Sequence, residues 1–113
     1  MLSRKNRLKK NKEFSYVYKK GKVLGDKYFT IHYVFTNLAD PKIGISINKK
    51  VGNSVVRHRF KRLLTEALRP LVPSIKLKNY VITAKPEIIN STLIDLHAHL
   101  VECLTRGNLY AGN

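Results

Sequence analysis

The sequence has few of the features that are typical of secreted proteins, membrane-spanning proteins or proteins stabilised by a structural metal ion. It contains one cysteine, Cys103, among 113 residues, which excludes an internal disulfide framework and a cysteine-based zinc finger. No apolar run approaches the roughly 20 residues that a membrane span requires. Residues 2–10 are mostly polar and do not resemble a secretory signal peptide. We therefore expect a cytoplasmic protein that makes no contact with a membrane.

Acidic residues are also scarce, and they are unevenly distributed. There are 22 Lys and Arg residues but only 7 Asp and Glu residues, a formal net charge of +15. Residues 1–62 carry 17 basic and three acidic residues, whereas residues 63–113 carry five and four. Positive charge gathered in one half of a folded domain indicates a polyanionic partner, and nucleic acid is favoured. An anionic membrane surface is the alternative, but no basic helix with a broad apolar face supports it.

The sequence supplies no set of residues typical of a protein active site. The acids are too sparse for a two-metal nuclease cluster, and Cys103 is expected to pack in the core. The histidines are scattered over the predicted elements: His32, His58, His97 and His99. We predict no catalytic residue and no metal site on the protein. A self-sufficient protein nuclease would need a carboxylate cluster or a histidine pair that this chain does not offer.

With 43% hydrophobic residues, the chain can bury a core, and we expect one RNA-binding domain over residues 1–113. Periodicity predicts helices over 11–20, 54–68 and from 90 or 91 to about 106. It predicts strands over 27–35, 43–48 and 79–84, and a further short strand is considered near Val23. The order of elements is then α-β-β-β-α-β-α.

The first ten residues are predicted to form an exposed basic arm. Its cations are Arg4, Lys5, Arg7, Lys9 and Lys10. A disordered tail and an organelle transit peptide are the alternatives. The transit peptide is disfavoured because Leu2 and Leu8 alone cannot make an apolar face.

The helix predicted over 54–68 carries the densest positive charge. Its apolar residues follow the 3.6-residue period, while Arg57, Arg59, Lys61 and Arg62 occur within six positions without an interleaved acid. Like charges one turn apart repel by a few tenths of a kcal/mol each, which favours a phosphate-binding surface over a merely solvated one. The preceding connection, residues 49–53, adds cations and a turn at the helix N-terminus, where exposed amides also favour phosphate.

Residues 49–64, Lys-Lys-Val-Gly-Asn-Ser-Val-Val-Arg-His-Arg-Phe-Lys-Arg-Leu-Leu, closely resemble the signature of the bacterial ribonuclease P protein subunit. In that family the central triplet is typically Arg-Asn-Arg, followed one residue later by Lys-Arg, and here His58 replaces the Asn. The opening segment 6–11, with Phe14, Tyr18 and Gly21 after it, is similar to the family's first helix. The resemblance covers nearly the whole chain.

The resemblance implies an α/β (α+β) two-layer sandwich with a ribosomal protein S5 domain 2-like fold and a left-handed βαβ crossover. It implies a protein that assists a catalytic RNA, with Mg²⁺, in removing the 5′ leader from precursor transfer RNA. No cofactor bound by the protein alone and no obligate protein partner are expected. The residues expected to contact the catalytic RNA are Lys49, Lys50, Asn53, Arg57, His58, Arg59, Lys61 and Arg62.

The resemblance also implies a cleft that holds the single-stranded leader, lined by Phe14, Tyr18, Phe29 and His32. Stacking of bases on aromatic rings in a positive groove is how proteins hold single-stranded RNA. The same aromatic residues could instead belong to the core, because a small domain needs large apolar side chains. A basic ribosomal protein, or another structural RNA-binding protein without a role in transfer-RNA processing, remains the alternative function.

Overall fold

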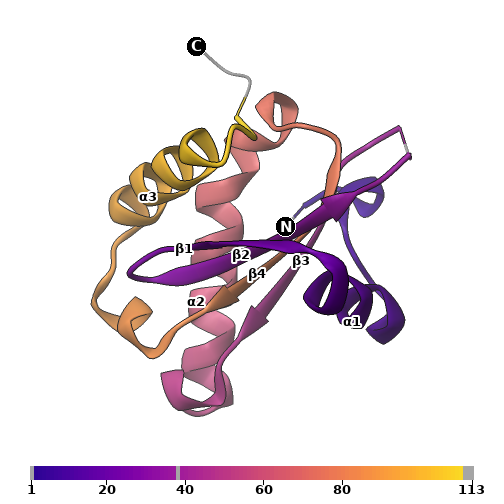
Figure 1. Ribbon diagram of the computed structural model, residues 1–113. Coiled ribbons are helices and arrows are strands. Elements are labelled where there is room, and N and C mark those ends of the chain that lie inside the picture. The colour runs from indigo at the N-terminus through magenta and orange to yellow at the C-terminus, as the bar shows by residue number, and fades with distance from the viewer. Residues whose placement is uncertain (1, 38, 111–113) are drawn as a thin grey trace.

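The computed structural model describes residues 2–37 and 39–110, which fold into a four-stranded sheet with three α-helices (Figure 1). The helices are α1 (Asn11–Lys20), α2 (Ser54–Leu68) and α3 (Leu93–Arg106). The strands are β1 (Lys22–Gly25), β2 (Phe29–Phe35), β3 (Lys42–Ile47) and β4 (Lys78–Ala84). The predicted order α-β-β-β-α-β-α is confirmed, and β1 is the short strand considered near Val23.

The sheet is mixed, with the strand order β1-β2-β4-β3. The pairs β1–β2 and β2–β4 are antiparallel, whereas β3 and β4 lie side by side in parallel and are joined through α2. Because β4 is inserted between β2 and β3, the strand β3 forms one edge of the sheet.

Helices cover the two faces of the sheet unequally (Figure 1). The larger core lies between one face and the pair α2 and α3, where Ile31, Ile82, Leu64 and Leu100 are almost fully buried. On the opposite face, Val17 of α1 packs with Leu8 and Val81 in a smaller cluster. Strand alternation produces this division, because neighbouring residues of a strand point to opposite faces. The result is an α/β sandwich in which α1 covers only part of the second face.

Local side-chain hydrogen bonds set the helix boundaries. Asn53 caps α2, because its side-chain oxygen accepts a hydrogen bond from the Val56 amide at 3.0 Å. The helix α3 begins at Leu93, slightly later than predicted. There the Thr92 hydroxyl accepts from the Asp95 amide, and the Asp95 carboxylate accepts from the Thr92 amide. Residues 86–90 form a separate 3₁₀ turn that starts at Pro86.

The prediction of an exposed N-terminal arm is wrong for residues 2–8. Leu2 and Leu8 are 7% and 6% exposed, and the Leu8 amide donates to the Ile43 carbonyl oxygen of β3 at 3.0 Å. The Asn6 side chain is buried and donates to the Pro41 carbonyl oxygen at 2.8 Å. The open edge of β3 offers backbone groups that a passing segment can satisfy, and this docking removes both leucines from water. Of the five predicted cations of the segment, only Arg7 is half-buried and the other four are exposed.

Candidate nucleic-acid interface

The cations of α2 share the side of the helix that does not enter the core. We call Arg57, Arg59, Lys61 and Arg62 the basic cluster. Phe60 and Leu64 are buried against the sheet and α3, whereas Arg59, Lys61 and Arg62 are exposed and Arg57 is half-buried. His58 is exposed among them and lines one surface hollow with Lys61 and Arg62. The structure therefore brings the sequence-predicted residues of this helix together on one surface.

Nearly all acids are engaged elsewhere in the described part of the chain. Asp26 binds His99 and the Tyr28 amide, and Asp40 lies 3.8 Å from Lys5. Side-chain contacts with the same protein also hold Glu13, Glu66, Asp95 and Glu102. Glu66 borders the same hollows as His58, Lys61 and Arg62 and forms an ion pair with Arg69. The four cations of the basic cluster outnumber this acid, which suits a surface that binds phosphates.

The connection before α2 presents two further cations beside the helix N-terminus. Lys49 and Lys50 are exposed in a 3₁₀ turn, and the Lys50 amide donates to the Asn48 side chain at 2.8 Å. Gly52 follows with φ +156°, ψ −164°, a conformation that favours glycine, and a Cβ there would also press on Val56. Asn53 itself is committed to capping the helix, so its predicted contact with RNA has to coexist with that hydrogen bond.

A second surface lies where α1 crosses the less covered face of the sheet. Tyr18 is 40% exposed, and its hydroxyl lies 2.9 Å from the Thr83 hydroxyl of β4. Its ring meets His32 of β2 edge to face, with 4.9 Å between ring centroids. Burial lowers the pKa of His32 below its ordinary value, so the imidazole is neutral at pH 7. These contacts hold an aromatic ring in place while leaving part of it open to a stacking partner.

Phe14 is seated on the same face, against the backbone of β3. The ring lies directly over Gly44, where any Cβ would collide with it. Phe14 is half-buried and packs on the small cluster of Val17 and Val81. The predicted residues Phe14, Tyr18 and His32 are thus brought to one face of the sheet, which we call the α1 face.

Phe29 does not belong to this face, and its prediction as a cleft residue is wrong. Its side chain is fully buried in the larger core on the side of α2 and α3. Phe29 and His32 are three residues apart on one strand, so alternation places them on opposite faces. A base cannot stack on a ring that is 0% exposed.

The α1 face also contains residues that were not predicted. Thr30, Thr83 and Ser46 are aligned in register across β2, β4 and β3, so three hydroxyl groups follow one another beside Tyr18. The small, polar side of the strand 43–48 was visible in the sequence as alternation of Ile with Gly and Ser. What the sequence could not supply was the strand order that aligns these side chains.

The chain is similar over nearly its whole length to known proteins. The model of the family described as Ribonuclease P matches residues 2–108. The chain belongs to the ribonuclease P protein family. A ribonuclease P protein component of Alkaliphilus metalliredigens is 38% identical over 105 residues, covering 92% of this chain and 95% of the relative. A ribonuclease P protein component of Clostridium novyi is 36% identical over 113 residues, covering 96% and 99%.

The fold is similar to that of solved ribonuclease P proteins. The Staphylococcus aureus protein superposes with a TM-score of 0.84 at 27% identity, covering 93% of this chain and 97% of that chain. Family and fold together establish the function as that of a ribonuclease P protein component, which acts in transfer-RNA processing and has an RNA partner.

The two histidines of α3 and the cysteine of this ribonuclease P protein contact other parts of its own fold. His97 Nδ1 lies 3.2 Å from the Ala67 carbonyl oxygen of α2, and His99 Nδ1 lies 2.9 Å from Asp26. Cys103 is fully buried, and burial raises the pKa of its thiol to about 11. Within residues 2–37 and 39–110, no group of three or more His, Cys, Asp or Glu side chains could hold a metal ion.

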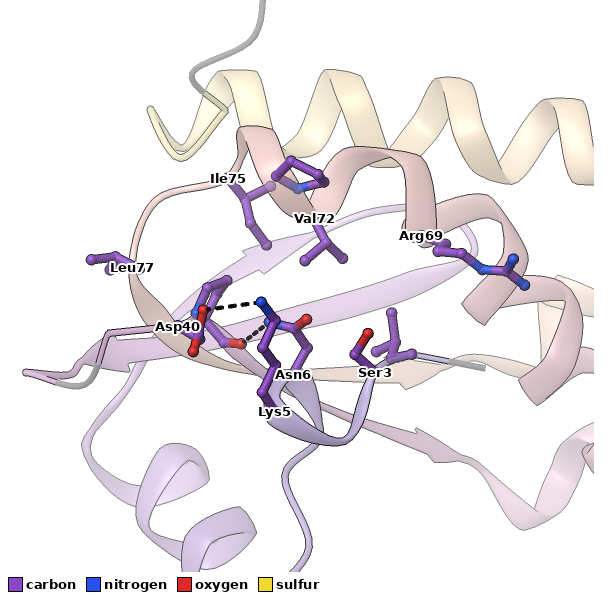
Figure 2. A pocket seen from close by; sticks show the side chains of 11 residues that line it. Ser3, Lys5, Asn6, Asp40, Arg69, Val72, Ile75 and Leu77 are labelled. Atoms are coloured by element: carbon purple, nitrogen blue, oxygen red, sulfur yellow. Dashed lines mark hydrogen bonds and ion pairs between the residues drawn. The ribbon is translucent and has the colours of Figure 1, made fainter.

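A hollow of about 440 Å³ separates the docked N-terminal segment from the 3₁₀ turn after α2 (Figure 2). Figure 2 shows Lys5 and Asn6 on one side and Arg69 and Val72 on the other. Lys5 faces Asp40, and Arg69 forms an ion pair with Glu66. Acids thus offset both cations at this hollow.

Proposed function

We propose that this chain binds the catalytic RNA of ribonuclease P and the 5′ leader of precursor transfer RNA on two separate surfaces. The basic cluster and residues 49–53 bind phosphates of the catalytic RNA, and the α1 face binds the leader. The observation that carries the proposal is the division of chemistry between the two. The basic cluster offers four cations that outnumber the acid beside them, Glu66, while the α1 face offers a held aromatic ring with neighbouring hydroxyls.

Each surface is suited to its proposed RNA. Folded RNA presents mainly phosphates, which exposed Arg and Lys side chains neutralise. Single-stranded RNA presents unstacked bases and 2′-hydroxyls, which aromatic rings and Ser or Thr hydroxyls recognise. Tyr18 supplies the ring, and Thr30, Thr83 and Ser46 supply the hydroxyls. The protein, bound to the catalytic RNA, therefore orients the leader relative to that RNA.

We further propose that the RNA subunit performs the cleavage with Mg²⁺. In such a reaction Mg²⁺ would stabilise charge on the attacking and leaving oxygens. The described residues do not fit a resident Mg²⁺ ion, because they supply no cluster of carboxylates. Side chains at the two surfaces are binding groups: the cations hold phosphates, and Tyr18 holds a base without transferring a proton.

We also propose that the protein works in the cytoplasm. Among residues 2–37 and 39–110 no helix has the length and apolar character needed to cross a bilayer. The support for the proposal is the positive charge, which suits a protein that resides with RNA.

The test is reconstitution with rigorously RNA-free protein. A precursor transfer RNA is incubated with the protein alone, with the RNA subunit alone at limiting Mg²⁺, and with both. We expect no cleavage by the protein alone and faster cleavage by the mixture than by the RNA alone. Cleavage by the RNA-free protein that is lost on mutating its own carboxylates would overturn the proposal.

A further inference from the structure

A groove at the open edge of β3 joins segments whose cations lie far apart in the sequence. Its volume is about 300 Å³, at the small end of ligand sites in proteins. Cations from the N-terminal segment and from α2 line it, namely Arg7, Lys9 and Lys61. Phe14, Gly44 and Ile45 are among the residues that form its less polar part. Among the described residues, no acid lines this groove, in contrast to the hollow of Figure 2, which Asp40 borders.

The fold explains why the groove is open. The N-terminal segment pairs with β3 only around Ile43, through a bridge with Arg7 and a hydrogen bond from the Leu8 amide. The chain then turns into α1, which begins at Asn11. Beyond Ile43, the edge of β3 therefore has the side chain of Phe14 on one side and Lys61 of α2 on the other.

Arg7 is held in a way that leaves a donor without an acceptor. Its side chain is half-buried, and its Nε atom is buried without a hydrogen-bond partner among the described residues. The hydroxyl of Thr65, also in the groove, already donates to the Lys61 carbonyl oxygen at 2.7 Å. A buried donor that lacks an acceptor is costly, so the guanidinium of Arg7 keeps hydrogen-bonding capacity that the described residues do not satisfy.

We propose that this groove binds one nucleotide of the leader, with its phosphate between Arg7 and Lys61 and its base against Phe14. The inference rests on the proposed function and extends the path of the leader from Tyr18, across Phe14, to the edge of β3. It makes Lys61 the cation of the basic cluster that contacts the leader, while Arg57, Arg59 and Arg62, which do not line the groove, stay with the catalytic RNA. Three cations without an acid match a phosphodiester, and a forked guanidinium suits phosphate geometry. The small volume favours a single nucleotide over a duplex.

The first test compares charge-neutralising variants in the reconstituted holoenzyme. Arg7→Gln and Lys61→Gln are assayed beside Lys76→Gln, which removes an exposed cation outside the groove. The readout is the affinity for precursor relative to mature transfer RNA, with the RNA subunit saturated. Loss of a charged hydrogen bond predicts a loss of about tenfold in precursor affinity for the groove variants, with mature affinity unchanged. Lys76→Gln should leave the ratio as it is.

A double variant tests whether the two cations hold the same phosphate. If they do, the combined loss in Arg7→Gln/Lys61→Gln should be smaller than the product of the two single losses, because partners of one group are not additive. Thermal melting is recorded for each protein. If Arg7→Gln does not fold at the assay temperature, Lys61→Gln carries the test beside Arg62→Gln, which removes an exposed cation of the basic cluster outside the groove and should leave the ratio of precursor to mature affinity unchanged.

The outcomes separate this inference from the proposed function. If the ratio of precursor to mature affinity is unchanged in the groove variants but reduced in Tyr18→Ala, the groove is not a leader site and the α1 face still is. If the ratio is unchanged in the groove variants and in Tyr18→Ala, both the groove proposal and the proposed leader site are overturned. A selective loss in the groove variants that Lys76→Gln does not share supports the inference.

Photo-crosslinking identifies the RNA in the groove. Lys9→Cys places a thiol at the rim, and the native Cys103 is fully buried, so a thiol-directed photoreactive label attaches to the new residue. We expect crosslinks to leader nucleotides, and none from the same label on Lys76→Cys. Crosslinks from residue 9 only to the catalytic RNA, or to the mature part of transfer RNA, would overturn the assignment to the leader.

Discussion

Replacing Gly44 by alanine should disturb the α1 face without touching either the basic cluster or the larger core. A Cβ atom at this position would lie 2.5 Å from Cε2 of Phe14 and closer still to Cζ. Carbon atoms in contact are about 3.5–4.0 Å apart, so the ring has to move by about 1 Å or more. Phe14 lies in the first turns of α1, and its displacement would tilt the helix or expel the ring from its seat on β3.

The expected cost follows from this crowding. Over-packing by one methyl group typically costs about 1–3 kcal/mol, and each kcal/mol lowers the melting temperature by about 4–8 °C in a domain near this size. Because Phe14 would leave its position, Gly44→Ala should also reduce the preference of the holoenzyme for precursor over mature transfer RNA. Affinity for the catalytic RNA should stay the same, since the basic cluster is unaffected.

Thermal melting and binding of the two transfer-RNA forms measure these effects. Gly25→Ala is the matched control, because an added Cβ there meets nothing within 4 Å. The double variant Gly44→Ala/Phe14→Leu should recover part of the lost stability, since a shorter side chain makes room and residues in contact couple by about 0.5–3 kcal/mol. If the Gly44→Ala protein melts at the same temperature as the parent and discriminates leaders equally well, then the position of Phe14 over Gly44 matters neither for stability nor for leader binding.

Three further predictions follow from the placement of individual side chains. Alanine at all four positions of the basic cluster should weaken RNA binding with little change in the melting temperature. The slope of log affinity against log salt concentration should become shallower by roughly 0.7–0.9 per lost phosphate contact, and an unchanged slope would contradict the assignment. Phe29→Ala should cost about 3–5 kcal/mol of folding stability and impair every activity together, whereas Tyr18→Ala should stay folded and lose leader preference alone; equal melting of the two variants would contradict their placement. Because burial lowers the pKa of His32 below 6.5, the unfolded chain binds more protons there, so stability should fall as pH drops below 6.5; His32→Gln should make this dependence weaker, and an identical pH profile would contradict it.

Much of the fold could be predicted because local signals agreed with it. The bounds of α2 were predicted at both ends, since an Asn cap precedes an apolar stripe and Pro70 follows it. Periodicity likewise predicted α1 and the alternating Ile residues of β3. The start of α3 was displaced because Thr92 and Asp95 form a better cap than Asn90 or Ser91.

The N-terminal segment could not be predicted from its own residues. Leu2 and Leu8 fit neither a helical nor a strand period. They are buried because β3, which α1, β1 and β2 separate from them in the sequence, is an edge strand whose Ile43 carbonyl oxygen accepts from the Leu8 amide. Such a contact depends on strand order, which no local pattern contains.

The candidate site was predicted in part. The cations of α2 were identified because their density is itself a local signal. Phe29 was assigned to the cleft by resemblance, although alternation along the strand had already separated it from His32. Thr83 and Gly44 were missed, since their roles come from the register between β3 and β4 and from the seat of Phe14.

We propose that this protein adds leader recognition to a catalytic RNA. The affinity of the RNA subunit for precursor and for mature transfer RNA, with and without the protein and at one fixed salt concentration, tests this directly. We expect the protein to tighten binding of the precursor and to leave binding of the mature form nearly unchanged. Equal tightening of both forms, or of neither, would contradict it.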